Sequence, residues 1–172
     1  STGLSGISMH LRIPEGRVVA AETLNPKIGI EGGISVLGTT GLVEPWDDHL
    51  TETVMERVRT SDRVVLTTGR TGLRYARLLF PDHEAVLAGS HLKAAIAEAR
   101  GPVVLCGLPA LILKFLDPEL EGTTGYATIE EFSTRPEFKD RMFAAFAKGK
   151  ERYPGLRIVI VDRNGAIMGD SG

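Results

Sequence analysis

The sequence contains few of the features that mark disulfide-rich, metal-cluster or membrane proteins. It has one cysteine, Cys106, in 172 residues, which excludes an internal disulfide and a thiolate-rich metal cluster. Cys106 ends an apolar run, where a lone cysteine is most often a small buried hydrophobic side chain. No apolar stretch approaches the roughly 18–20 residues that cross a bilayer, and no basic-then-apolar signal segment opens the chain. We therefore expect a cytoplasmic protein without a membrane partner.

An excess of charge of one sign is also missing. The formal net charge is −2 and the isoelectric point is near 6.1, and no basic stripe is visible along the chain. This balance gives no electrostatic footprint for nucleic acid, so we expect no nucleic-acid partner. Apolar residues make up 42% of the sequence, which is enough for one globular domain with a real core, alone or with a small lobe.

The middle of the sequence repeats one pattern three times: a short apolar run, a turn of small residues, and a helical stretch. The apolar runs are residues 63–67, 84–88 and 102–106. The helices that follow them are expected to end near Leu79, Arg100 and Leu116. This order predicts an α/β fold with Rossmann-like βαβ units and a mainly parallel sheet. A further helix, capped by Asp47 or Asp48 and running to about Arg59, is expected to precede them.

The carboxyl-terminal part predicts a last helix and a hairpin. Residues 117–135 read as irregular, and residues 136–151 as a helix. The expected apolar face of this helix consists of Phe138, Met142, Phe143, Phe146 and Ala147. Residues 156–161 read as a strand, and the turn pair at 164–165 leads into a second strand at 166–168.

The residue pattern of the first part of the chain differs from that of the rest. Residues 7–13 alternate as a half-buried strand does, and residues 14–16 form a turn signal. Residues 25–41 hold five glycines, too many for a helix or regular strand, and predict a structured loop. Its side chains expected to pack against a core are Ile28, Ile30, Ile34, Val36 and Leu37. We divide the chain into a strand and loop segment, 1–45, completed by a missing upstream region, and an α/β domain, 46–172.

The ends of the three predicted strands are the best candidates for a binding site. In an open parallel sheet, ligands bind at the carboxyl ends of the strands near a topological switch point. Residues 67–72, 89–91 and 107–109 follow the strands, and the first and third lead into helix N-termini with free amides. Such a cradle suits an anionic or nucleoside-like cofactor. Alternatively, each glycine only makes a tight turn between a strand and a helix. The sequence motifs of dinucleotide-binding and phosphate-binding loops are absent.

Few side chains in the sequence suggest a catalytic group. The four histidines show no metal-ligand spacing, so no protein-bound metal is expected. His91 is the only histidine placed at a strand-to-helix turn, where it is a weak catalytic candidate or a cap of that helix. Four cations lie in or beside the glycine-rich loops: Lys27, Arg70, Arg74 and Lys114. They could bind the carboxylates of an anionic substrate, or be solvated surface charges.

One run of sequence resembles a known family. Residues 23–45, TLNPKIGIEGGISVLGTTGLVEP, resemble the signature run of the CbiD family, the cobalt-precorrin-5B C(1)-methyltransferases of anaerobic cobalamin biosynthesis. Residues 64–69, 89–95 and 105–114 follow in the family's order. The family's opening region is absent, so the chain looks like the family's carboxyl-terminal part.

The resemblance implies methyl transfer from S-adenosylmethionine to a ring carbon of a carboxylate-rich cobalt tetrapyrrole, the expected substrate partner. It gives Lys27, Arg70, Arg74 and Lys114 the task of binding that substrate. The donor is then expected along the glycine-rich loop and two strand ends. These cofactor-binding candidates are Gly32, Gly33, Ser35, Gly38, Thr39, Thr40, Gly41, Thr68, Gly69, Gly107 and Pro109.

Two other classes of function stay open at this point. The chain could be a non-catalytic CbiD-like domain that binds S-adenosylmethionine or a tetrapyrrole, or an enzyme of different chemistry on the same α/β core. The oligomeric state is also open, a homo-oligomer or a partnership with a separate amino-terminal chain included.

Overall fold

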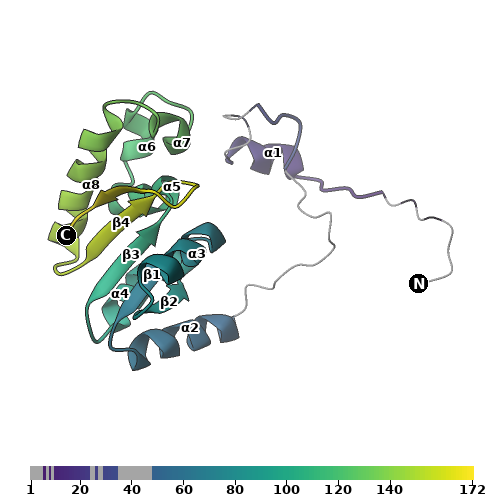
Figure 1. Ribbon diagram of the computed structural model, residues 1–172. Helices are drawn as coiled ribbons and strands as arrows, with labels where there is room; N and C mark the ends of the chain where they lie inside the picture. The colour runs from purple at the N-terminus through teal and green to yellow at the C-terminus, as the bar shows by residue number, and fades with distance from the viewer. Residues whose placement is uncertain (1–5, 7, 9, 24–25, 27–28, 35–47) are drawn as a thin grey trace. The chain divides into compact units, whose positions relative to one another are not determined.

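The chain divides into two compact units, Ser1–Glu44 and Pro45–Gly172. The structure is a computed structural model (Figure 1). The residues that it describes are 6, 8, 10–23, 26, 29–34 and 48–172.

The second unit is built on a five-stranded sheet with the order β2-β1-β3-β4-β5. The strands are β1 (Val64–Thr67), β2 (Glu84–Leu87), β3 (Val103–Gly107), β4 (Arg157–Val161) and β5 (Ile167–Asp170). The first four run parallel, and β5 pairs antiparallel to β4. The structure thus confirms the predicted α/β fold with a mainly parallel sheet that ends in a hairpin.

Helices cover both faces of this sheet (Figure 1). On one face α3 (Arg70–Leu79) packs against β1, β2 and β3. The helices of the other face are α2 (Asp48–Thr60), α4 (Leu92–Glu98), α5 (Pro109–Leu116) and α8 (Phe138–Arg152). A doubly wound arrangement of this kind results when successive crossovers turn to opposite sides of the sheet.

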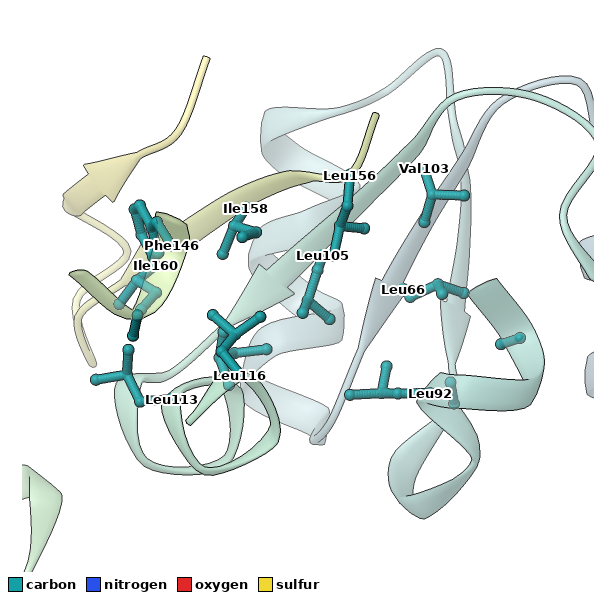
Figure 2. Packing of buried hydrophobic residues seen from close by; sticks show 14 of the residues in the cluster. Leu66, Leu92, Val103, Leu105, Leu113, Leu116, Phe146, Leu156, Ile158 and Ile160 are labelled. Atoms are coloured by element: carbon teal, nitrogen blue, oxygen red, sulfur yellow. The ribbon is translucent and has the colours of Figure 1, made fainter. Parts of the chain in front are cut away.

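The larger core lies between the sheet and the four helices (Figure 2). Leu66, Leu105 and Ile158 point from three adjacent strands toward this face, and each is completely buried. Leu92 from α4 and Leu116 from α5 pack in the same core, opposite these strand residues. The strands read as continuous apolar runs in the sequence because both of their faces are buried.

Two short helices lie in residues 117–135, where we expected irregular chain. They are α6 (Leu120–Thr123) and α7 (Ile129–Phe132). The side chain of Thr128 caps α7 by accepting a hydrogen bond from the Glu131 amide, and Ile129 and Phe132 anchor the helix in the core. A single turn carries too few residues to show a helical period, so the sequence pattern missed both helices.

The buried face of α8 differs slightly from the predicted one. Phe138, Met142 and Phe146 are buried as expected. Phe143 is 42% exposed, however, and Ala147 is exposed too. Small residues, Ala145 and Gly149, face the sheet instead. The buried face of α8 is therefore rotated about the helix axis relative to the predicted face, which was defined by the large apolar side chains.

The first unit also departs from the prediction. Residues 10–13, described within the predicted strand 7–13, form no strand, because the described part of this unit offers them no partner strand. The helix α1 (Gly16–Ala21) follows them. In the glycine-rich loop, Gly29 and Gly32 have positive φ angles of 76° and 88°; Gly29 lies in a turn, and Gly32 and Gly33 lie in a bend. Ile30 is 42% exposed rather than packed in a core.

The hairpin before β5 allows a direct test of the packing. Gly165 has a φ of 88°, and a Cβ built there would lie 2.3 Å from the Tyr75 ring. Gly155 has a similar φ of 84° with nothing within 4 Å. We expect Gly155→Ala to lower the free energy of unfolding by about 1 kcal/mol through backbone strain alone, and Gly165→Ala by about 3 kcal/mol because a clash is added. Equal losses in urea unfolding would contradict the contact.

Candidate functional site

The strand order places the switch point of the sheet between β1 and β3. The helix after β1 crosses on one face and the helix after β3 on the other, so the two following loops diverge there. Thr68 and Gly69 follow β1, and Leu108 and Pro109 follow β3. Four of the cofactor-binding candidates, Thr68, Gly69, Gly107 and Pro109, therefore lie at the carboxyl ends of two neighbouring strands.

The glycines at this edge have different roles. A Cβ on Gly72 would lie 3.2 Å from the Gly107 Cα and 3.4 Å from the Cys106 carbonyl oxygen. A Cβ on Gly107 would lie 3.4 Å from both Ile112 and the Thr68 hydroxyl. Gly72 thus allows α3 to approach β3 closely, whereas Gly107 leaves room for Ile112 of α5 and for the Thr68 hydroxyl. A Cβ on Gly69 would meet nothing within 4 Å, so its backbone faces open space where a ligand can approach.

Two helices begin at this edge without a side-chain cap. Gly69 is the extended residue before α3, and no side chain caps that helix. Leu108 stands in the same position before α5, again without a side-chain cap, and Pro109 is the first residue of the helix. The first-turn amides of both helices therefore point toward the carboxyl edge, where they favour negative or polar ligand groups.

A cavity of about 220 Å³ lies beside this edge, at the ends of β3 and β4. Its apolar walls are Leu108, Pro109, Ala110, Leu111 and Met168. Its polar residues are Glu130, Ser133, Asp162 and Arg163. Small-molecule sites commonly combine apolar walls with a few polar groups in this way.

The polar side of the cavity is organised by two contacts. Arg163 donates to the Glu130 carboxylate at 2.7 Å, and that hydrogen bond raises the pKa of Arg163 above its ordinary value. One oxygen of Asp162 accepts hydrogen bonds from the amides of Asn164 and Ala166, each at 2.8 Å. Sequence reasoning missed these residues, although Asp162 follows an apolar strand as the predicted site residues do.

A buried hydroxyl lies directly beneath the edge. Thr67, the last residue of β1, has no exposed surface, and its Oγ1 has no hydrogen-bond partner among the described residues. Its neighbour in space, Cys106, is equally buried, and that burial raises the pKa of the thiol to about 11. The cysteine therefore stays protonated and serves as a packing residue, as the sequence predicted.

The remaining predicted residues are spread more widely. Arg70 and Arg74 are exposed on the first turns of α3, near the edge, and the Arg74 guanidinium lies 5.6 Å from the Tyr75 ring centre. Lys114 is in the last turn of α5, away from the carboxyl edge. His91 is half-buried after the outer strand β2, where it precedes α4 without a side-chain capping bond.

Other candidates belong to the first unit. Gly32 and Gly33 line a cavity of about 520 Å³ with Arg12 and Arg17, two cations that the sequence reasoning did not single out. Six candidates lie outside the described residues: Lys27, Ser35, Gly38, Thr39, Thr40 and Gly41.

Among the described residues, no group of three or more His, Cys, Asp and Glu side chains could hold a metal ion. No helix in the same part of the chain is long and apolar enough to span a membrane.

Comparison with known proteins shows close relatives. The sequence model of the CbiD family matches residues 1–45. A "Cobalt-precorrin-5B C(1)-methyltransferase" of Methanoregula boonei is 56% identical over 99% of this chain and 51% of its own length. The protein of that name from Methanospirillum hungatei is 55% identical over 99% of this chain and 51% of its own length.

A solved structure agrees with the fold. The crystal structure of the cobalamin biosynthesis protein CbiD from Archaeoglobus fulgidus is 34% identical, with a TM-score of 0.52. The match covers 86% of this chain and 43% of that one.

The fold defines the class of domain, and the matches define the family. The second unit is a doubly wound α/β domain with a ligand-sized cavity at the carboxyl edge of its sheet. The chain belongs to the CbiD family and corresponds to the carboxyl-terminal part of its relatives. It spans about half the length of the curated relatives that it matches.

Thr67 provides a test of the buried edge. Replacing its unpartnered hydroxyl by a methyl group in Thr67→Val is expected to raise the free energy of unfolding by about 1 kcal/mol, because a buried polar group without a partner is costly. Thr128→Val is the matched control, because the Thr128 hydroxyl caps α7, and it should lower stability by about 1 kcal/mol. Denaturant unfolding of both variants measures the two signs, and a loss of stability in Thr67→Val would show that its hydroxyl has a partner.

Proposed function

We propose that this chain supplies the α/β part of an S-adenosylmethionine-dependent methyltransferase that acts on a ring carbon of a cobalt-precorrin. The names of the relatives support the reaction class. The observation that carries the proposal is the juxtaposition of the open turn at Gly69, the start of α5 and the adjoining apolar cavity at the switch point of the sheet. Doubly wound sheets bind their ligands at this place.

The chemistry of the cavity fits the proposed donor. S-adenosylmethionine combines a flat adenine ring with polar ribose and amino-acid groups and a positive sulfonium. The walls at Leu108 and Met168 suit the adenine ring, and the carboxylates of Asp162 and Glu130 suit hydroxyl or cationic groups. The open backbone at Gly69 allows the extended donor to continue along the edge toward α3.

Arg70 and Arg74 are the best placed of the proposed substrate-binding cations. Both lie on the exposed first turns of α3, beside the carboxyl edge. A guanidinium binds carboxylates with two parallel hydrogen bonds, which suits a carboxylate-rich tetrapyrrole. Lys114 lies at the opposite end of α5, so it would have to meet the substrate elsewhere. Lys27 remains a candidate on sequence grounds alone.

The role of this chain would be to position the reactants. When bound, the donor supplies a methyl group on a positive sulfonium, a reactive carrier that needs little chemical assistance. The protein residues would hold the donor in the apolar cavity, keep water from it and orient it toward the acceptor carbon. No proton-transfer residue is assigned, and the position of His91 beside the outer strand leaves it a weak candidate.

A binding module without catalysis is the second candidate. It is favoured by one observation: the chain spans only about half the length of its relatives. Binding of S-adenosylmethionine without a methylated product, even when the amino-terminal half of a relative is supplied, would support this alternative.

Calorimetry with S-adenosylmethionine and S-adenosylhomocysteine tests the proposed site. Gly69 has extended backbone and open space around it, so Gly69→Val should fold normally and obstruct only a ligand on its backbone. We expect it to weaken binding of both ligands at least tenfold, about 1.4 kcal/mol.

Two control variants locate the donor. Gly122→Ala, at another open glycine, should bind as the wild type does. Gly33→Val tests the glycine-rich loop of the first unit in the same way, because no atom lies within 4 Å of its built Cβ. Loss of affinity in Gly33→Val with none in Gly69→Val would move the donor to that loop. An absence of heat with either ligand would contradict donor binding by this chain.

A further inference from the structure

The first unit exposes an unusual amount of apolar surface for its size. Five of its large hydrophobic side chains are at least 42% exposed, with Val18 the most exposed at 72%. We refer to them as the apolar set: Leu11, Ile13, Val18, Val19 and Ile30. The much larger second unit adds only four such side chains among its described residues: Leu78, Leu111, Phe143 and Ile167. So many exposed apolar side chains on so small a unit favour an interaction with a partner.

The described part of the first unit has almost no core of its own. Only Gly16 and Ala20 are buried there, and α1 is six residues long. A helix that short is unstable in water unless a neighbour covers its apolar side. A segment of about 40 residues likewise cannot bury enough surface to be stable by itself. The apolar set therefore needs a covering partner.

The comparisons indicate what that partner is. The match of the family's sequence model ends at residue 45, at the boundary between the two units. The relatives are about twice as long as this chain, and they match it in their carboxyl-terminal part. The first unit therefore aligns with the region of the relatives that directly follows their additional half.

We propose that the apolar set docks onto the amino-terminal half of a CbiD-family chain, and that the first unit is structurally a part of that half. Gly29 and Gly32, whose positive φ angles are rarely adopted by other residues, would then belong to the docked segment. The inference does not depend on the proposed methyl transfer, since it concerns packing and not the donor site.

Co-expression tests the docking directly. The amino-terminal half of the Methanoregula boonei relative, which lies outside its match to this chain, is produced together with the full 172-residue chain carrying an affinity tag. The two should co-purify as a one-to-one complex. The double variant Val18→Glu and Val19→Glu should reduce the recovered amino-terminal half at least tenfold, because it places two charges in the apolar set.

Leu78→Glu is the matched control. Leu78 is 67% exposed, close to the value for Val18, but lies on α3 in the second unit. It should leave recovery unchanged. Equal recovery with the Val18 and Val19 double variant would overturn the proposal. Two other results would also overturn it. In one, the wild-type chain forms a homodimer through Val18 and Val19; in the other, the second unit loses thermal stability in the double variant. Either result gives the apolar set a different partner.

Hydrogen exchange provides a second measurement that does not need a soluble amino-terminal half. That half is fused to Ser1, and the exchange of amides 11–30 is compared with that of the chain alone. Docking predicts at least tenfold slower exchange in the fusion for α1, with unchanged exchange in the sheet. Equal rates for α1 would contradict the proposal. Donor affinity, measured on the same proteins, reports separately on the proposed function.

Discussion

The close approach of α3 to β3 is the contact on which the candidate site depends. It exists because Gly72 lacks a side chain: a Cβ there would lie 3.2 Å from the Gly107 Cα and 3.4 Å from the Cys106 carbonyl oxygen. Ala76, one turn further along α3, is completely buried on the same face. The helix α3 therefore packs close to the sheet, and its first turn lies near the end of β3. A larger side chain at Gly72 would push α3 away from β3 and separate the two loops that form the edge.

This contact explains why the edge is rich in small residues without all of them serving a ligand. Gly107 serves packing, whereas Gly69 leaves its backbone open. The sequence could not separate these roles, because both glycines follow an apolar strand. The distinction depends on which atoms lie opposite each glycine, and those atoms come from a different strand and helix.

The fold itself was largely predictable. The repeated order of apolar run, small turn and helix specified β1 to β3 with their helices, and the Asn164-Gly165 pair specified the last hairpin. The strand order was not predictable from that pattern, since it depends on which face each crossover takes. Single-turn helices such as α7 were missed because a buried pair and one threonine cap stabilise them. Residues 10–13 have the alternation of a strand but no strand partner among the described residues.

The candidate site could be predicted only in part. The position of Thr68, Gly69, Gly107 and Pro109 at strand ends was predictable because strand ends are local features of the sequence. The adjoining cavity was not, because Glu130, Asp162 and Met168 come from three segments that only the folded chain brings to Pro109. For the same reason the sequence grouped Lys114 with Arg70, although α5 carries Lys114 away from the edge.

We place donor binding at the carboxyl edge of the sheet, at its switch point. Titration of the isotope-labelled chain with S-adenosylhomocysteine, followed by amide chemical shifts, tests this placement. We expect the largest shifts on residues 68–70, on 108, 110 and 111, and on 162–163. Shifts confined to the opposite, amino-terminal edge of the strands, or no shifts at all, would contradict it.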